Sequence, residues 1–180
     1  NYILSSMDKD NKNFNEVLVK AKNLGYAESN PSSDLNGDDV SSKLKILSSL
    51  CFNSFLNNNI YVEGIKDIDK SDIDNANKLG YKIKLLGFSE LINNKIYQRV
   101  HPTLIKQDSY VASIDGVLNA VIVDGKPIGQ STIQGEGAGP AATTSALISD
   151  ISSILRGNIK FPFSLSSIKR KKLKFENINE

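Results

Sequence analysis

Acidic residues and one lysine cluster between residues 28 and 43. The cluster consists of Glu28, Asp34, Asp38, Asp39 and Lys43. Asp39 and Lys43 are four residues apart, so in a helix they lie on one face and can form an ion pair. A lysine held by a carboxylate beside an apolar surface can exchange a proton with a hydroxyl or carbonyl oxygen. The spacing therefore indicates a possible proton-transfer pair.

The same cluster also has a structural interpretation. Carboxylates at the start of a helix interact favourably with its dipole, and an exposed aspartate–lysine pair at this spacing is common on helix surfaces. Spacing alone leaves both interpretations open. A calcium-binding loop is excluded, because Gly37 comes too early after Asp34 and no bidentate glutamate follows at the required distance.

A glycine-rich segment, Gly135-Glu136-Gly137-Ala138-Gly139, lies between a predicted strand and a predicted helix. Glycines allow a ligand to approach the backbone closely, and a helix N-terminus favours anionic groups. The spacing is GxGxG, whereas a dinucleotide fingerprint has GxGxxG and lies in a longer alternation of strands and helices. The segment therefore predicts a tight turn or a contact with a cofactor that another domain binds.

Three other reactive or charged features favour structural roles. His101 precedes Pro102 at the end of a predicted strand, which is typical of a turn. Cys51 falls on an apolar helical face, so we expect a buried thiol. The basic run 169–172 has no interleaved aromatic residues and predicts a solvated tail. No cluster of cysteine and histidine supports a metal site.

The composition is that of a soluble globular protein. The chain has 180 residues, a net charge of +2, 39% apolar residues, 23% charged residues and a single cysteine. The single cysteine excludes an intrachain disulfide, and the near-neutral charge gives little overall electrostatic field for collecting nucleic acid. No apolar run approaches the roughly 20 residues that a membrane span needs.

Hydrophobic periodicity predicts an α+β fold with a mixed, mostly antiparallel sheet and helices packed on one face. Helices are expected at 2–8, 14–24, 37–52, 71–80 and 141–155, and strands at 61–65, 81–88, 95–104, 116–123 and 128–134. We expect one domain over residues 1–157 and a basic tail or linker over residues 158–180.

Local signals add detail to this pattern. Residues 26–36 predict an irregular connection, and Ser71 to Asp74 resemble a capping box. The packing face of the third helix is expected to contain Val40, Leu44, Leu47 and Cys51.

One long motif resembles a known family. Residues 21–43, with the sequence AKNLGYAESNPSSDLNGDDVSSK, are similar to the signature of homoserine dehydrogenases. Segments on either side of this motif also resemble sequences of the family. They are residues 1–4, 62–65, 79–86, 119–121, 137–139 and 143–146. The resemblance covers residues 1 to about 157.

The resemblance implies an enzyme that interconverts L-homoserine and L-aspartate 4-semialdehyde with NADP or NAD, in the cytoplasm, on the route to threonine and methionine. It also implies that an N-terminal Rossmann domain binds most of the cofactor and that a C-terminal ACT domain follows in many bacterial members. This chain corresponds to the substrate-binding and dimerisation region, so we expect it to be inactive by itself. We expect a homodimer formed through the sheet, with neither nucleic acid nor membrane as a partner.

The resemblance also implies roles for individual residues. Lys43 would exchange the proton with the substrate oxygen, and Asp39 would orient Lys43. Glu28 would bind the substrate ammonium group, and Asp34 would shape the polar pocket. Gly25 and Tyr26 would also bind the substrate. Gly137, Ala138 and Gly139 would lie near the nicotinamide end of the cofactor.

An alternative from another class stays open. The chain could be a catalytically inert dimerisation or amino-acid-binding module on the same scaffold. The joint presence of Glu28, Asp34, Asp39 and Lys43 favours the enzyme, because drift would not spare these four in particular.

Overall fold

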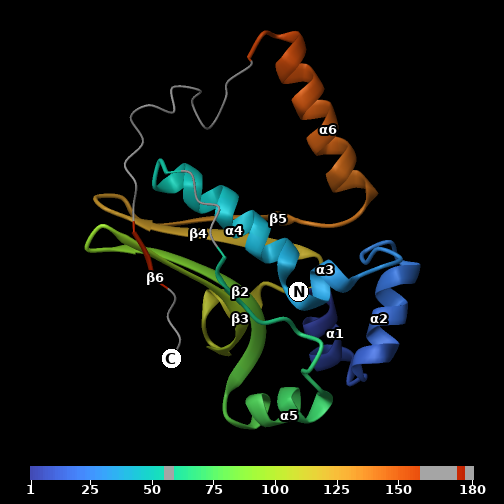
Figure 1. Cartoon of the computed structure of the whole chain (residues 1–180). Helices are drawn as coiled ribbons and strands as arrows, with labels where there is room; N and C mark the ends of the chain where they lie inside the picture. Colours follow the sequence, from blue (N-terminus) through green and yellow to red (C-terminus); the bar gives the residue numbers. More distant parts are fainter. Residues whose placement is uncertain (55–58, 159–173, 177–180) are drawn as a thin grey trace. The chain divides into compact units, whose positions relative to one another are not determined.

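The computed structural model describes residues 1–54, 59–158 and 174–176 (Figure 1). The chain divides into two compact units, and each unit is assembled from separate segments of the sequence. The first unit contains residues 1–29, 68–84 and 104–157. The described part of the second unit contains residues 30–54, 59–67, 85–103, 158 and 174–176. Two long strands, β2 (Tyr81–Ile92) and β3 (Lys95–Lys106), contribute residues to both units.

Helices α1 (Tyr2–Asp10), α2 (Phe14–Asn23) and α5 (Lys70–Lys78) build the core of the first unit. Helix α1 contacts both α2 and α5. Buried apolar side chains recur at three- and four-residue steps on these helices, so each helix presents one apolar face. The core of these helices includes Leu4, Met7, Val17, Ala21, Ile73 and Ala76.

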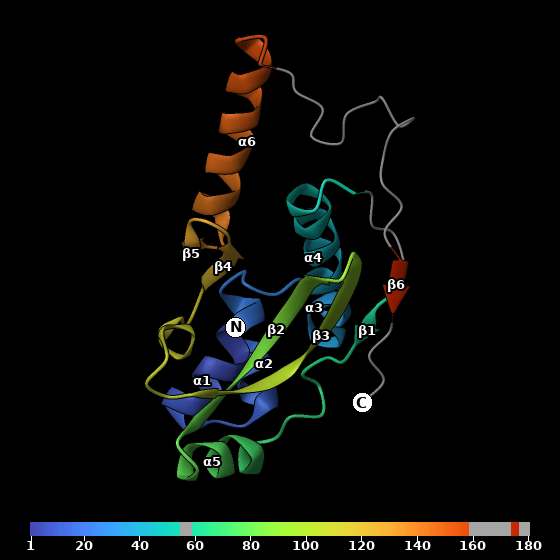
Figure 2. The same cartoon turned by 90° about the vertical axis from the view of Figure 1, so that its left-hand side faces the viewer.

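The first unit continues through the 3-10 helix η1 (Tyr110–Ser113), a hairpin and a last helix. Strands β4 (Leu118–Gly125) and β5 (Gly129–Glu136) pair antiparallel along their whole length. Figure 2 views this hairpin nearly end-on, with α6 leading away from it. Helix α6 (Pro140–Leu155) follows, and its first residue is a proline, which suits the start of a helix.

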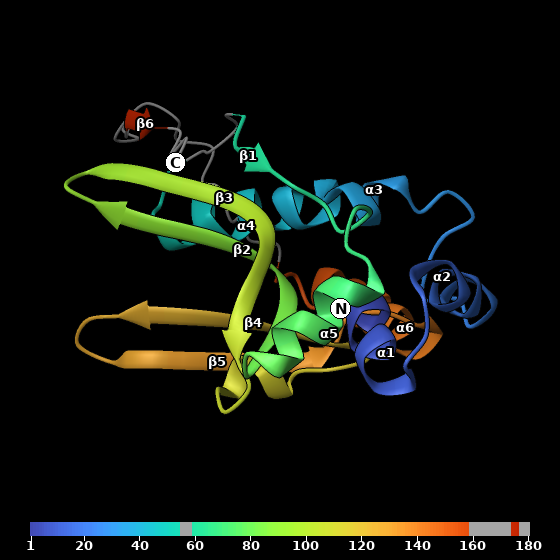
Figure 3. The same ribbon diagram turned by 90° about the horizontal axis from the view of Figure 1, so that it is seen from below.

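The second unit contains α3 (Ser32–Asn36), α4 (Asp38–Cys51), β1 (Tyr61–Val62) and the adjoining parts of β2 and β3. Figure 3 shows β2 and β3 running antiparallel. Their turn consists of Asn93 and Asn94, which both have positive φ and thus suit a tight hairpin. Strand β1 and the short strand β6 (Lys174–Glu176) each pair with β3 in parallel.

The structure confirms the α+β fold class, and the strands form two sheets. Every predicted helix and strand is present, with boundaries shifted by a few residues. A short helix, α3, replaces part of the irregular connection expected at 26–36. The capping box begins earlier than expected, because Asp69 has the extended backbone of an N-cap and bonds reciprocally with Asp72.

The prediction for the packing face of α4 was partly wrong. Val40 and Leu44 are half-buried and lie against Gly87 of β2, as expected for a packing face. Leu47 and Cys51, however, are exposed. The buried positions of α4 are instead Ser41, Ser48 and Ser49.

Two further predictions concern membrane spans and the basic tail. Within the residues that the structure describes, no helix combines the length and apolar character needed to cross a bilayer. The basic run 169–172 lies outside the described residues.

Candidate functional site

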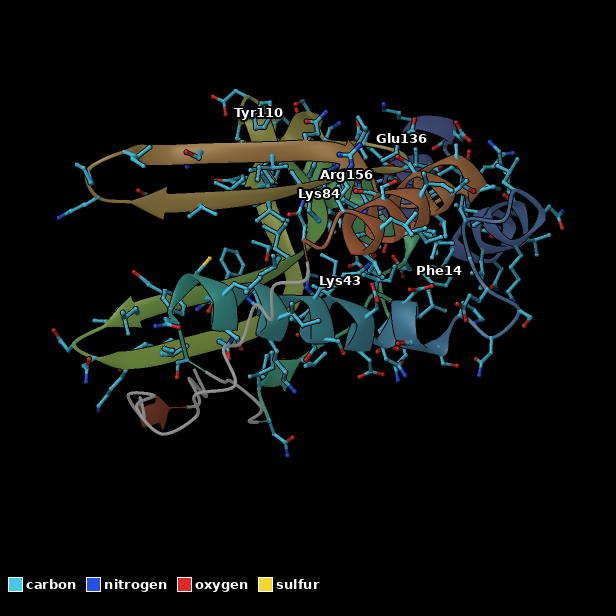
Figure 4. All side chains as sticks on the ribbon, turned by 90° about the horizontal axis from the view of Figure 1, so that it is seen from above. Phe14, Lys43, Lys84, Tyr110, Glu136 and Arg156 are labelled. Carbon is cyan, nitrogen blue, oxygen red and sulfur yellow. The ribbon has the colours of Figure 1, made fainter. Side chains whose placement is uncertain are left out.

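The Asp39–Lys43 pair lies on the first turns of α4 in the second unit (Figure 4). Lys43 Nζ is 2.6 Å from Asp39 Oδ2, so the predicted ion pair is present. The Lys43 side chain is 60% exposed and the Asp39 side chain is 38% exposed. The ammonium group is therefore held in place and also accessible to a ligand. Asp34 belongs to the same unit, lies on α3 and is exposed.

Two glycines fix where α4 begins. Gly37 is the N-cap of α4 and has φ +85°, a conformation that other residues adopt only with strain. A Cβ at Gly37 would also lie 3.0 Å from Val62 Cγ1. A Cβ at Gly64 would collide with the Leu35 carbonyl oxygen, which accepts a 2.8 Å hydrogen bond from the Ile65 amide. The segments at 35–37 and 62–65 thus need glycines to pack closely, and this packing sets the position of the Asp39–Lys43 pair.

The predicted substrate-binding residues Gly25, Tyr26 and Glu28 follow α2 in the first unit. Gly25 has φ +73° and ends α2, and the Tyr26 amide donates a 2.9 Å hydrogen bond back to the Ala21 carbonyl. The Tyr26 ring packs on Tyr2 of α1, with 5.0 Å between ring centroids. Glu28 is exposed, so its carboxylate is available to a cation.

The glycine-rich turn lies between β5 and α6 in the same unit. The Gly137 amide donates a 2.9 Å hydrogen bond to the Val117 carbonyl. A Cβ at residue 137 would overlap the side-chain amide of Asn119, so a larger residue there would have to displace that side chain. Gly139 has φ +107°, and a Cβ on it would lie 3.7 Å from Cε1 of Tyr26. The structure therefore brings the predicted cofactor turn next to a predicted substrate-binding residue.

Sequence reasoning missed a buried charge cluster in the first unit. Lys84, labelled in Figure 4, belongs to β2. It is only 5% exposed, and its Nζ lies 2.6 Å from Asp115 Oδ1. Asp115 also contacts Lys9 at 3.0 Å and Lys82 at 3.6 Å. The signal in the sequence was a lysine between apolar residues in a predicted strand, where alternation places side chains on opposite faces.

The environment shifts the pKa of both central groups. Burial lowers the pKa of Lys84, and the hydrogen bond and charge of Asp115 offset only part of that effect. Burial acts against ionisation of Asp115, but hydrogen bonds from Lys84 and Lys9 outweigh it and bring the Asp115 pKa to about 2. Asp115 is consequently a carboxylate at any physiological pH.

His101 and Cys51 differ from each other in how they meet expectation. The predicted turn at His101 was wrong, because this residue lies within β3. Its Nε2 accepts a 3.0 Å hydrogen bond from Arg99 Nε, and its ring stacks on Phe88 with 5.7 Å between ring centroids. Its Nδ1 lies 2.8 Å from the Pro102 carbonyl, so both ring nitrogens have contacts within the strand, as a structural role requires. The prediction of a buried Cys51 was wrong, because this thiol is exposed at the end of α4.

The two units supply different chemical groups. The second unit offers an accessible, carboxylate-paired ammonium group at Lys43. The first unit offers the exposed Glu28 carboxylate and a glycine turn beside Tyr26. Among the described side chains, no group of three or more His, Cys, Asp or Glu residues could hold a metal ion.

Comparison with known proteins identifies the family. The family model of homoserine dehydrogenase matches residues 1–152. A homoserine dehydrogenase of Neisseria gonorrhoeae is 43% identical over 157 residues, which cover 87% of this chain and 36% of that protein. This chain thus spans little more than a third of the length of such a relative.

Solved structures agree with the sequence comparison. The crystal structure of a homoserine dehydrogenase from Thiobacillus denitrificans matches 98% of this chain and 43% of its own, with a TM-score of 0.85 and 36% identity. A hyperthermophilic archaeal homoserine dehydrogenase in complex with NADPH shares the fold, with a TM-score of 0.66 and 24% identity over 87% of this chain and 44% of that one. The chain therefore belongs to the homoserine dehydrogenase family.

Proposed function

We propose that this chain is the substrate-binding and catalytic part of an NAD(P)-dependent homoserine dehydrogenase. The enzyme interconverts L-homoserine and L-aspartate 4-semialdehyde in the cytoplasm, on the route to threonine and methionine. The observation that carries the proposal is the 2.6 Å ion pair between Asp39 and Lys43, because it lies within the family signature and its ammonium group is accessible.

The reaction needs a hydride acceptor and a proton acceptor. When homoserine is oxidised, the C4 carbon loses a hydride to the nicotinamide ring and its hydroxyl loses a proton. Lys43 exchanges that proton with the substrate oxygen, and in the reverse direction its ammonium group donates a proton to the aldehyde oxygen. Asp39 orients the Lys43 amine toward the substrate oxygen.

The remaining contacts recognise an amino acid and a nicotinamide. Glu28 binds the substrate ammonium group, Asp34 shapes the polar pocket, and Gly25 and Tyr26 line it. Residues 137–139 lie against the nicotinamide end of NADP or NAD. A turn in which Ala138 is the only residue with a side chain presents mostly backbone to a ligand, which suits contact with a flat ring.

The hairpin β4–β5 supports a homodimer. An isolated two-stranded sheet is marginally stable in water, and this one exposes apolar side chains, with Ile133 72% exposed. Pairing with a second copy would cover them. The full-length protein that contains this chain is called the parent enzyme or parent protein. Gel filtration with light scattering on the parent enzyme should give a dimer, and Ile133→Lys should shift it toward monomer. A monomeric wild-type parent would contradict the dimer.

The proposed function is tested in the parent protein, extended to its natural start. We expect reduction of NAD or NADP that depends on L-homoserine, and we expect Lys43→Ala to lower kcat by roughly 10² to 10⁴. Lys45→Ala, which removes a neighbouring lysine of α4, is the matched control. A normal kcat in Lys43→Ala would remove Lys43 from proton transfer. No activity of the wild type with either cofactor would favour the inert module.

The 180-residue chain by itself is expected to be inactive. Its described strands form a four-stranded and a two-stranded sheet, and neither is the doubly wound parallel sheet that binds a dinucleotide. Turnover by the purified chain would refute this expectation.

A further inference from the structure

Residues 114–118 connect η1 to β4, and side chains from two other segments hold this connector. Asn1 Nδ2 donates hydrogen bonds to the Ile114 carbonyl at 2.9 Å and to the Leu118 carbonyl at 2.7 Å. The Gly116 amide donates a 2.9 Å hydrogen bond to Ser5 Oγ. The N-terminal part of the chain therefore fixes the connector at its start, middle and end.

Lys84 holds the connector from β2. Its Nζ donates 2.6 Å hydrogen bonds to the Ile114 carbonyl and to Asp115 Oδ1, and a 3.3 Å hydrogen bond to Asn1 Oδ1. These three acceptors satisfy the three donors of an ammonium group. Lys9 and Lys82 also contact Asp115, but Lys84 is the most deeply buried of the three lysines. A buried ammonium group restrains its acceptors strongly. If one of its hydrogen bonds breaks, water cannot replace the lost acceptor, and the unsatisfied charge destabilises the folded chain.

The connector in turn holds the glycine-rich turn. The Val117 carbonyl accepts the 2.9 Å hydrogen bond of the Gly137 amide. Just after the connector, the Asn119 side chain occupies the space that a side chain at Gly137 would need. A chain of contacts thus runs from Lys84 through residues 114–118 to residues 137–139.

We propose that Lys84 is a positioning residue for the turn at residues 137–139. By fastening the connector to β2 and to Asn1, it sets the position of Val117 and therefore of Gly137. Lys84 itself contacts neither the turn nor any reacting atom. The consequence for catalysis rests on the proposed function, which places this turn against the nicotinamide.

Hydrogen exchange tests the positioning without reference to activity. In the parent protein, Lys84→Met keeps the length of the side chain and removes its hydrogen bonds. We expect peptides covering residues 114–118 and 135–139 to exchange roughly tenfold faster or more, while peptides of α5 keep their rates. Lys70→Met, which breaks the half-buried Lys70–Asp74 pair of α5, is the matched control and should leave both segments unchanged. Unchanged exchange of residues 135–139 in Lys84→Met would overturn the proposal.

A second variant covers the case in which Lys84→Met does not fold. Asn1→Ala removes the Asn1 Oδ1 acceptor of Lys84 Nζ together with the two hydrogen bonds that Asn1 Nδ2 donates to the connector, and it leaves the ammonium group with Ile114 and Asp115. It should accelerate exchange of the same two segments by a smaller factor. An Asn1→Ala protein that folds and keeps wild-type exchange there would equally overturn the proposal.

Steady-state kinetics then tests the link to the cofactor. We expect Lys84→Met to lower kcat/KM for the cofactor roughly ten- to a hundredfold, with KM for homoserine nearly unchanged. Faster exchange together with a normal cofactor KM would support Lys84 as the anchor and would overturn the role of the turn in cofactor binding, which belongs to the proposed function.

Discussion

Asp39–Lys43 and Lys70–Asp74 show what spacing can and cannot say about a residue. Both pairs are four residues apart on a helix, and their ions are 2.6 Å and 2.7 Å apart. Helical geometry alone explains both contacts. The first pair differs because it lies within a long family signature, after a glycine N-cap that close packing requires. The ion pair supports the proposed chemistry of Lys43 because of where it lies, within that signature, and not because of its distance alone.

Glu28 gives the residue-scale prediction. Glu28→Gln keeps the shape of the exposed side chain and removes its charge, so it should weaken binding of the substrate ammonium group. We expect the parent enzyme to show a roughly tenfold or greater rise in KM for homoserine with little change in kcat, because a hydrogen bond to a charged group contributes about 1.5–3 kcal/mol. Glu16→Gln, on the first turn of α2, is the control. An unchanged KM in Glu28→Gln would exclude the proposed contact.

Helix α4 shows at the scale of an element why a hydrophobic pattern can mislead. Its buried positions are small serines, and its larger residues Ile46, Leu47 and Leu50 are 36–53% exposed. Ser49 can be buried because its hydroxyl donates a 2.6 Å hydrogen bond to the Lys45 carbonyl in the preceding turn. Periodicity marks which residues of the helix are apolar, but it does not say which positions of the helix are buried.

Gly37 gives the prediction at this scale. Gly37→Ala must adopt φ +85° and must also push Val62 away, whereas Gly80→Ala must adopt φ +81° in open space. The left-handed conformation costs about 1–2 kcal/mol for a residue with a Cβ. We expect urea unfolding to show a loss of that size for Gly80→Ala and a clearly larger loss for Gly37→Ala. Equal losses would mean that the contact with Val62 is not tight.

At the scale of the whole molecule, the two units draw on segments far apart in the sequence. The first unit is held together by Asp115, which binds Lys84 and Lys82 of β2 and Lys9 of α1. One carboxylate thus joins all three segments of this unit. Protonation of this carboxylate should therefore lower the free energy of unfolding of the unit at low pH.

The pKa of Asp115 sets the pH window for this effect. Its pKa is about 2 in the folded chain and 3.8 for an ordinary aspartate, so the unfolded chain takes up the proton more readily. The stabilisation is complete above about pH 4 and is lost as the pH falls toward about 2. We expect the urea concentration at the unfolding midpoint of the wild type to decrease as the pH is lowered from about 4 to about 2. The midpoint of Asp115→Asn should be lower at pH 4 and should change less over this range. Asp124→Asn, which removes an exposed carboxylate of the β4–β5 hairpin, should follow the wild type. Parallel curves for wild type and Asp115→Asn would contradict the role of Asp115.

The sequence by itself determined the order of helices and strands, the α+β class, the family and the ion pair at Asp39 and Lys43, because each depends on local spacing or on one contiguous motif. It did not reveal α3, the serine face of α4, the exposure of Cys51 or the burial of Lys84. These features depend on contacts between distant segments, such as Lys84 with Asp115 and Gly139 with Tyr26. Only the tertiary structure decides them, since burial is a property of neighbours that a linear pattern does not contain.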